Sequence, residues 1–254
     1  MRTLEQRFNL SGKSAAVVGG AGVLCSTLVQ AFLESGIRVA VLDLPKAKRN
    51  LPVDLLRSVD WLDCDVTSKK DLTRCRDALL RKYGKVDILL NGAGKNAPTP
   101  FFKISAREIQ QIMGVNLAGT LYSCQVFGAA MVRQRSGSII NFASVAAGPP
   151  LSKAFVYSAA KAGVLNLTQN LAREWAASGV RVNALRPGFF PTEWSMKHFI
   201  DRDRKRKILN HTPMGRFGRS EELIGAVLWL CSDSASFVTG ALVTVDGGFT
   251  AMTI

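Results

Sequence analysis

Short runs of apolar residues alternate with longer amphipathic stretches along the whole chain, and this alternation restricts the fold more than any other feature. The runs predict seven strands, at Ser14–Val18, Arg38–Leu42, Val59–Leu62, Val86–Leu90, Ser138–Phe142, Arg181–Leu185 and Leu242–Val245. Helices are expected at Val23–Glu34, at Asp71–Tyr83, from Ser105 to about Arg133, at Ser152–Ala177 and at Glu221–Cys231. The prolines at positions 45 and 52 predict mainly loop after the second strand.

Strands that are apolar on both faces and alternate with helices are typical of a parallel sheet that is covered on both sides. No linker, repeat or composition shift divides the sequence. It therefore predicts an α/β fold, with residues 1–254 forming one domain around a doubly wound parallel sheet of about seven strands.

The composition excludes several other classes of protein. With 47% hydrophobic and 20% charged residues in 254, the chain can bury a core and is not of the disordered type. Its five cysteines form no C-x-x-C pair and it has only two histidines, which disfavours a disulfide framework and a metal site. We therefore expect no metal. Because the first residues also lack an apolar signal core, we expect no secretion and a cytoplasmic location.

The net charge of +14 raises the question of a nucleic-acid partner. The basic residues are scattered, and the densest run, Arg202–Lys207, is interrupted by an aspartate. We therefore expect no nucleic-acid partner and attribute the positive field to anionic ligands. Two uncharged stretches, Ser14–Leu33 and Ile109–Val132, are as long as a membrane span, but glycines break the first and polar amides interrupt the second. Both are predicted to be core elements, so no membrane partner is expected.

The first predicted strand ends in a glycine-rich turn, Gly19–Gly22, and a helix follows from Val23. Glycines at such a turn let the backbone approach a pyrophosphate, and the helix N-terminus supplies amide donors. Asp43 ends the second strand, where a carboxylate can bind the adenosine ribose and repel a 2′-phosphate. This favours NAD over NADP, although three basic residues that follow soften the preference. The alternative role for Asp43 is to cap a loop.

Tyr157 and Lys161 are spaced to lie on one face of a helix. An ammonium near a phenol stabilises the phenolate and lowers its pKa, which would let the tyrosine exchange a proton with a substrate oxygen. Ser144 lies just beyond a predicted strand and can hydrogen-bond the same oxygen. Asn116 is a polar residue within an apolar helix, and its alternative role is that of a satisfied core amide.

Together these residues resemble the short-chain dehydrogenase/reductase family along essentially the whole chain. The resemblance rests on Gly19–Cys25, Asp43, Asp65-Val66, Asn91–Gly94, Asn116, Ser144, Tyr157, Lys161, Pro187-Gly188 with Thr192, and Asp246–Gly248. It implies a Rossmann-type fold, a nicotinamide cofactor and a catalytic tetrad of Asn116, Ser144, Tyr157 and Lys161. In that tetrad Tyr157 is the general acid–base and Ser144 orients the substrate carbonyl. Lys161 lowers the tyrosine pKa and holds the nicotinamide ribose, and Asn116 supports a water-linked proton relay.

The same resemblance implies a set of cofactor-binding residues. They are Gly19, Gly22, Val23, Leu24, Asp43, Asp65, Val66, Asn91, Gly92, Ala93, Tyr157, Lys161, Pro187, Gly188 and Thr192. The chain departs from the family pattern at Val18 and Cys25, where the family usually has threonine and glycine. Valine cannot tie the turn with a hydroxyl, and cysteine adds bulk, so weaker cofactor binding is expected.

Four segments are similar to a narrower group, the D-mannonate oxidoreductases or fructuronate reductases, which interconvert a keto sugar acid and an aldonate with NAD(H). The segments are Gly22–Leu24, Gln125–Gly128, Pro187–Phe190 and His211–Gly218. They predict an NAD(H)-dependent oxidoreductase that acts on a sugar acid or polyol. Two alternatives stay open: a ketoacyl-type or other secondary-alcohol reductase, and a regulatory or binding homologue with poor cofactor affinity.

The substrate is expected between Ser144, Tyr157 and the segment after Gly188, with residues 189–210 forming a mobile lid. Candidate substrate residues are Lys95, Asn96, Lys153 and Arg186, and at least one of the three cations is expected to bind a substrate carboxylate. The alternative is that all three are solvated. The apolar segments Phe249–Ile254 and Ile224–Leu230 predict a homo-oligomer, for which the family resemblance implies a tetramer.

Overall fold

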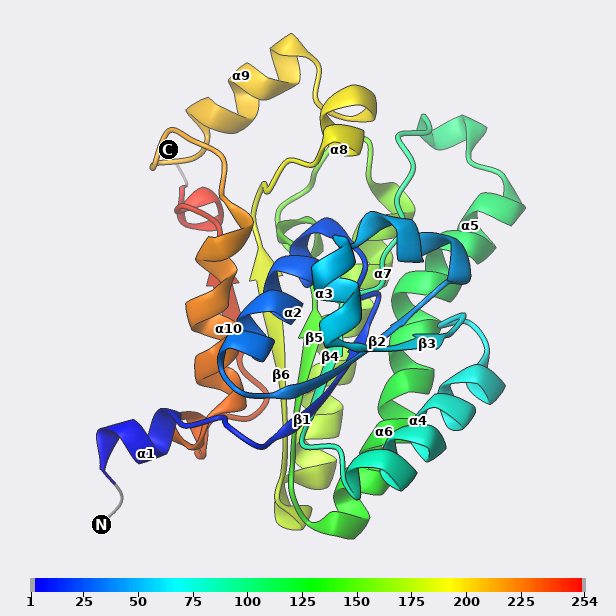
Figure 1. Ribbon diagram of the computed structural model, residues 1–254. Coiled ribbons are helices and arrows are strands. Elements are labelled where there is room, and N and C mark those ends of the chain that lie inside the picture. The colour runs from blue at the N-terminus through cyan, green and yellow to red at the C-terminus, as the bar shows by residue number, and fades with distance from the viewer. Residues whose placement is uncertain (1–2, 253–254) are drawn as a thin grey trace.

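The computed structural model describes residues 3–252, which form one parallel sheet and the helices around it (Figure 1). Its strands are β1 (Ser14–Val18), β2 (Arg38–Asp43), β3 (Asp60–Asp63), β4 (Ile88–Asn91), β5 (Gly137–Phe142), β6 (Val180–Pro187) and β7 (Leu242–Val245). They lie in the order β3-β2-β1-β4-β5-β6-β7, and every neighbouring pair is parallel. The predicted fold class is confirmed.

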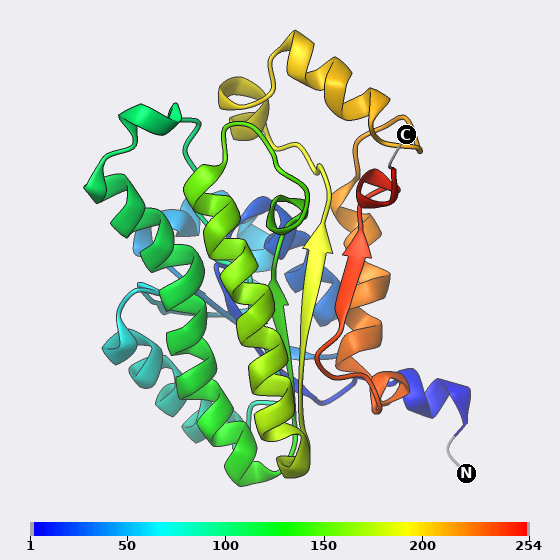
Figure 2. The same cartoon turned by 180° about the vertical axis from the view of Figure 1, so that it is seen from behind.

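Helices cover both faces of the sheet (Figures 1 and 2). They are α1 (Leu4–Phe8), α2 (Val23–Glu34), α3 (Val53–Ser58), α4 (Lys69–Tyr83), α5 (Ala106–Met113), α6 (Gly119–Gln134), α7 (Phe155–Trp175), α8 (Glu193–His198), α9 (Arg202–Asn210) and α10 (Ile224–Cys231). The core on one face includes residues of α2, α3 and α10, and the core on the other includes residues of α4, α6 and α7.

The two cores explain why the strands are apolar without alternation. In β1, Ala15 and Val17 belong to one core, whereas Ala16 and Val18 belong to the other. Successive side chains of a strand point to opposite faces of its sheet, and both faces of this sheet are covered. Every residue of β1 is therefore buried.

The structure contains helices that the sequence analysis does not predict, namely α1, α3, α8 and α9. The connection after β2 was expected to be mainly loop, but it contains a 3-10 turn at Pro45–Asn50 and the helix α3. Pro45 lies in the first turn of one segment and Pro52 caps the start of the other, positions at which the missing amide hydrogen costs nothing. The prolines thus begin these helices rather than prevent them.

The uncharged stretch around residues 109–132 is a continuous helix. Ser105 caps α5 by accepting a hydrogen bond from the Glu108 amide at 3.1 Å, as predicted. A π-helical segment, Gly114–Ala118, then connects α5 to α6. The joined helix Ala106–Gln134 is long and apolar enough to cross a membrane, but 56% of its apolar window is buried inside the protein. It packs on α4 and on the sheet, in keeping with the predicted core element.

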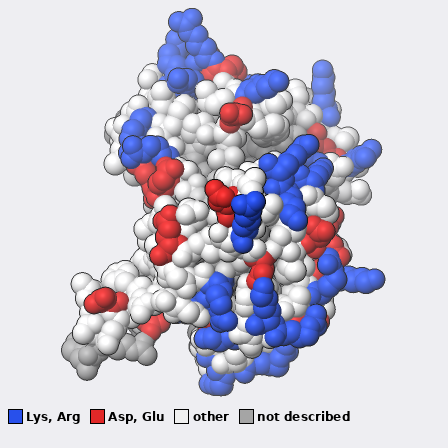
Figure 3. All heavy atoms as spheres, viewed as in Figure 1, with Lys and Arg blue, Asp and Glu red and all other residues white. Residues whose placement is uncertain are grey.

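Charged side chains are distributed over the surface in Figure 3. Lys and Arg lie there in several groups with Asp and Glu between them. The cysteines are all buried and free, and the described residues contain no group of three or more His, Cys, Asp or Glu side chains that could hold a metal.

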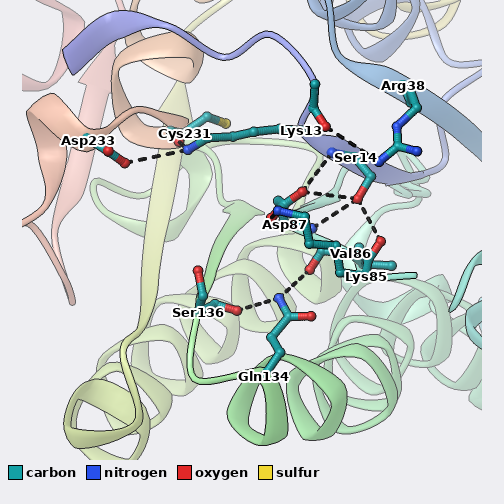
Figure 4. Close-up of polar contacts among 11 residues, drawn as sticks. Lys13, Ser14, Arg38, Lys85, Val86, Asp87, Gln134, Ser136, Cys231 and Asp233 are labelled. Carbon is teal, nitrogen blue, oxygen red and sulfur yellow. Dashed lines mark hydrogen bonds and ion pairs between the residues drawn. The ribbon is translucent and has the colours of Figure 1, made fainter. Parts of the chain in front are cut away.

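Polar contacts fix the amino ends of the central strands (Figure 4). The hydroxyl of Ser14 donates to the carbonyl oxygen of Lys85 at 2.7 Å, and the Ser14 amide donates to a carboxylate oxygen of Asp87 at 2.9 Å. Gln134 at the end of α6 donates to the Val86 carbonyl oxygen at 2.8 Å. Residues 85–87 therefore form irregular backbone before β4, and the strand begins later than the apolar run predicts.

Candidate functional site

Two grooves open at the carboxyl ends of the strands and share Gly92, Gly94 and Lys95. The larger has a volume of about 810 Å³ and includes the ends of β1 and β2. The smaller, of about 360 Å³, includes residues that follow β4, β5 and β6. Strand order reverses between β1 and β4, and ligands of open α/β sheets bind at such a switch point.

The glycine-rich turn forms one wall of the larger groove. Gly19 has φ +75°, and a Cβ there would lie 2.5 Å from the Ala93 amide nitrogen, so the position requires glycine. Helix α2 begins after Gly22 without a side-chain cap. The first amides of α2 therefore have no side-chain partner, as expected for a pyrophosphate site, and Gly22 lines the groove whereas Val23 and Leu24 do not.

Asp43 stabilises this turn and also lines the groove. One carboxylate oxygen accepts a hydrogen bond from the Ala21 amide at 3.0 Å, and the other accepts from the Leu44 amide at 2.8 Å. Asp43 thereby stabilises the turn with a side-chain hydrogen bond, which the valine at position 18 cannot form. Burial raises the pKa of Asp43, although the two backbone hydrogen bonds oppose the shift. Loop capping and exposure to the groove, which the sequence analysis treated as alternatives, occur together.

Other predicted cofactor residues fall into two groups. Asp65, Val66, Gly92 and Ala93 line the larger groove. Asn91 does not line the groove. Its side chain is buried at the carboxyl end of β4 and donates to Asn141 Oδ1 at 2.9 Å. Its amide supports the ends of β4 and β5 rather than facing the groove.

The larger groove fits a nicotinamide dinucleotide. It offers free amides at the turn for phosphate oxygens and a carboxylate at Asp43 for ribose hydroxyls. Apolar side chains, among them Leu42 and Val66, supply a surface for a ring. A volume of about 810 Å³ is suitable for a large ligand.

Cys25 does not obstruct this groove. Its side chain is 3% exposed and points toward Gly92, where a Cβ would lie 2.1 Å from Cys25 Sγ. Burial raises the pKa of Cys25 to about 12, so the thiol is neutral. The added bulk that was expected to weaken cofactor binding is accommodated by the glycine opposite.

Ser144 and Tyr157 line the smaller groove, hereafter the substrate pocket. Burial raises the pKa of Tyr157, and a hydrogen bond with Ser144 lowers it to a smaller extent. Lys161 donates from Nζ to the Phe142 carbonyl oxygen at 2.7 Å, and Nζ lies over the Tyr157 ring, 5.6 Å from its centroid. Burial lowers the pKa of Lys161 to about 8. In this structure burial is the larger influence on the pKa of Tyr157, and the lowering by Lys161 that the sequence predicts stays a prediction.

Asn116 lies in the π-helical segment and is fully buried. Its Nδ2 donates to the carbonyl oxygens of Lys95 at 2.7 Å and Ile112 at 2.8 Å. The side chain thus fastens the segment after β4 to the long helix. This satisfied core amide is the alternative that the sequence left open, and it places Asn116 directly behind the residues shared by the two grooves.

The four candidate substrate residues separate into two pairs. Lys95 and Asn96 line the substrate pocket. Lys153 does not, because its ammonium pairs with Asp201 at 3.1 Å on the surface. Arg186 does not either, since its Nε donates to Thr244 Oγ1 at 2.9 Å on the neighbouring strand β7. Of the three candidate cations, at least one of which was predicted to bind a carboxylate, only Lys95 lines the pocket, because local partners hold Lys153 and Arg186 elsewhere.

The segment 189–210 forms much of the pocket wall. Thr192 caps α8 by accepting from the Ser195 amide, and Asp201 caps α9 by accepting from the Arg204 amide. Gly188 and Thr192 line the pocket, whereas Pro187 ends β6 behind it. Apolar side chains of the segment that line the pocket are Phe189, Phe190, Pro191, Trp194, Phe199 and Ile200.

Sequence reasoning missed Arg204, which also lines the substrate pocket. It lies within the run Arg202–Lys207, which resembles a solvated charged surface. A signal was present, because Arg204 precedes the buried Ile208 by four residues and so shares its helix face. On α9 the flanking basic residues are exposed, whereas Arg204 is half-buried.

Comparisons with known proteins give consistent relatives. A family model described as enoyl-(acyl carrier protein) reductase matches residues 22–250. An uncharacterized oxidoreductase, UxuB, of Bacillus subtilis is 38% identical over 96% of this chain and 96% of its own. A gluconate 5-dehydrogenase from Burkholderia cenocepacia, solved with NADP and tartrate, has a TM-score of 0.92 and 28% identity over 99% of this chain and 100% of its own. A protein provisionally described as a D-mannonate oxidoreductase, from Haemophilus influenzae with bound NAD, has a TM-score of 0.89 and 32% identity over 99% of each chain.

Proposed function

This chain belongs to the short-chain dehydrogenase/reductase family, and we propose that it transfers a hydride between NAD(H) and a sugar acid of the D-mannonate/D-fructuronate type. As a member of this family, it is an oxidoreductase that acts on CH–OH groups. One observation carries the proposal: the pocket that contains Ser144 and Tyr157 shares Gly92, Gly94 and Lys95 with the groove that fits a dinucleotide. A substrate oxygen placed at Tyr157 therefore lies beside the nicotinamide end of that groove.

The catalytic residues follow from this placement. A bound nicotinamide supplies or accepts the hydride. An unperturbed phenol is protonated near neutral pH, so the Tyr157 hydroxyl can donate a proton to a ketone oxygen during reduction and take it back during oxidation. Ser144 holds the same oxygen through its hydroxyl. Lys161 holds the nicotinamide ribose. Asn116 supports a water-linked proton relay, and its side chain donates to the Lys95 carbonyl oxygen next to the pocket.

The proposed preference for NAD rests on Asp43. Its carboxylate faces the groove beside Leu44 and Lys46, where an adenosine ribose is expected. An ionised carboxylate binds ribose hydroxyls and repels a 2′-phosphate. The two solved relatives hold different cofactors, NADP in one and NAD in the other, so the choice varies among similar proteins.

An acidic substrate is supported by the charge of the pocket and of the chain. Lys95 lines the pocket, and Asn96 beside it offers polar atoms for hydroxyl groups. A net charge of +14 raises the local concentration of anions near the surface. The proposal includes a single domain with residues 189–210 as its substrate lid, a cytoplasmic location and a homotetramer. Of the expected association surface at 249–254, residues 253 and 254 lie outside the described part of the chain.

An acyl-thioester reductase is the second candidate. The apolar pocket wall, including Leu151, Phe189 and Phe199, suits an acyl chain as well as the carbon backbone of a sugar. A cofactor-poor regulatory homologue has less support, because Gly92 accommodates Cys25 and Asp43 holds the turn despite Val18.

Titration with NADH and NADPH tests the cofactor, with energy transfer from the tryptophans to the reduced nicotinamide as the signal. We expect NADH to bind more tightly. Turnover is then compared among aldonates, the matching alditols and an acyl thioester, with Tyr157→Phe as the inactive control that still binds NADH. Thioester reduction with NADPH alone would favour the second candidate, and binding of neither cofactor would favour the regulatory homologue.

A further inference from the structure

The substrate pocket carries two cationic side chains, Lys95 and Arg204, on otherwise largely apolar walls. Among the described residues that line it, none is an aspartate or glutamate. A cation next to apolar surface and without a lining anion attracts a negatively charged group, because the low local dielectric strengthens the interaction. The pocket is thus electrostatically suited to an anionic substrate.

Arg204 is held in place by neutral acceptors. Its two terminal nitrogens donate to Ser152 Oγ at 3.0 Å and to the Ser152 carbonyl oxygen at 2.8 Å. Asp201 lies nearby, but its carboxylate is engaged by the Arg204 amide at 2.8 Å and by Lys153 at 3.1 Å. A guanidinium has five N–H donors, so Arg204 retains donors for a ligand in the pocket.

The two cations differ in what they face. Lys95 lines both grooves and donates to Gln111 Oε1 at 2.6 Å. It therefore lies within reach of either a cofactor or a substrate. Arg204 lines the substrate pocket but not the larger groove that fits a dinucleotide. Arg204 is consequently the cation dedicated to the substrate.

We propose that Arg204 is the carboxylate-binding residue of this enzyme and the determinant of its preference for sugar acids over neutral polyols. This inference rests on the proposed function. A guanidinium and a carboxylate form paired, charge-assisted hydrogen bonds of defined direction. Since Arg204 belongs to α9, a bound carboxylate also ties that helix to the pocket. The bonds to Ser152 already orient the guanidinium, which reduces the entropy lost on binding.

The test compares Arg204→Met with Arg206→Met. Arg206 lies on the same helix, is 72% exposed and pairs with Asp203 at 2.7 Å, so the control removes an equal charge outside the pocket. Each variant is assayed with a six-carbon aldonate and with the alditol of equal length. We expect Arg204→Met to lower kcat/KM for the aldonate by about tenfold to a hundredfold, because a charged hydrogen bond is lost. The alditol should change by less than about twofold, and Arg206→Met should leave both substrates unchanged.

Ser152→Ala tests the orientation of Arg204, since it removes the Oγ acceptor but leaves the Ser152 carbonyl oxygen and the guanidinium in place. It should weaken aldonate turnover slightly, by less than Arg204→Met does, and leave the alditol unchanged. Equal losses for both substrates in Arg204→Met would show that the residue only fastens the lid and would overturn the proposal. An unchanged aldonate KM would overturn it as well.

Two controls keep the test interpretable. The NADH affinity and thermal unfolding of Arg204→Met report on its fold, and Arg204→Lys, which keeps the charge, should lose less aldonate activity. If the unmodified enzyme reduces or oxidises no sugar acid, the proposed function itself fails. If it uses aldonates and Arg204→Met does too, only the role of Arg204 fails.

Discussion

The Sγ atom of Cys25 occupies the space that a side chain on residue 92 would need, since a Cβ built on Gly92 would lie 2.1 Å from it. Cys25 lies in the first turn of α2 and Gly92 directly follows β4, so the two residues meet only in the folded chain. The pair holds the glycine-rich turn against the sheet below the dinucleotide groove. The Cys25 side chain is compatible with the fold because Gly92 opposite it has no side chain.

Gly92→Ala is therefore expected to destabilise the protein by about 1–3 kcal/mol through overpacking. Cys25→Gly should restore most of this loss in the double variant, because it removes the clashing sulfur. Urea unfolding of the two single variants and the double variant gives the coupling energy. Gly225→Ala is the matched control, because a Cβ there meets no atom within 4 Å. Additive effects of the two substitutions would contradict the contact.

Lys161→Met should change how stability depends on pH. Burial lowers the pKa of Lys161 to about 8 from 10.5, so between these values the unfolded chain binds more protons than the folded one. The free energy of unfolding then rises with pH in this window, by up to about 3 kcal/mol at 1.36 kcal/mol per pKa unit. The variant should lose this rise. Urea unfolding of cofactor-free protein from pH 7 to pH 10 measures it, and parallel curves for both proteins would refute the assignment.

Asp43→Asn should reduce the discrimination between NADH and NADPH. The amide keeps an acceptor for the Ala21 amide but removes the charge that repels a 2′-phosphate. We expect the ratio of the two dissociation constants to fall by about tenfold, which corresponds to about 1.4 kcal/mol. Fluorescence titration with each cofactor gives the ratio. Asp63→Asn, at an exposed position at the end of β3, should leave it unchanged. An unaltered ratio in Asp43→Asn would assign the selectivity to other groove residues.

Lys153→Met should leave the KM for an aldonate within about twofold, because an exposed ion pair such as Lys153–Asp201 contributes at most about 1 kcal/mol. Its side chain lies outside the substrate pocket, although it belongs to the same loop as Ser152. Steady-state kinetics beside Arg204→Met make the comparison. A tenfold rise in KM would return Lys153 to the candidate carboxylate-binding residues.

The sheet could be predicted from sequence because the signals for it are local. A strand buried on both faces, such as β1, must be apolar at every position, and a strand-to-helix turn close to a ligand must contain glycine. The start of β4 escaped prediction because Asp87, just before it, accepts hydrogen bonds from Ser14 on another strand. Contacts of that kind leave no local pattern.

The pocket was less predictable than the sheet. Lys95, Lys153, Arg186 and Arg204 all lie near strand ends or in the segment 189–210, and only Arg204 carries a local signal, its spacing of four residues from the buried Ile208. The structure separates them by their partners: Asp201 holds Lys153 and Thr244 holds Arg186, while Lys95 and Arg204 face the pocket.

The sequence by itself determined the fold class and the order of the strands along the chain, because a strand buried on both faces is apolar throughout, and it predicted the glycine-rich turn and, through the family resemblance, the candidate tetrad. Only the tertiary structure decided which cations line the pocket, how Cys25 is accommodated, and how deeply Tyr157 and Lys161 are buried. Direction, packing and solvation of a side chain depend on residues distant in the chain, and these come together only when the sheet and its helices assemble.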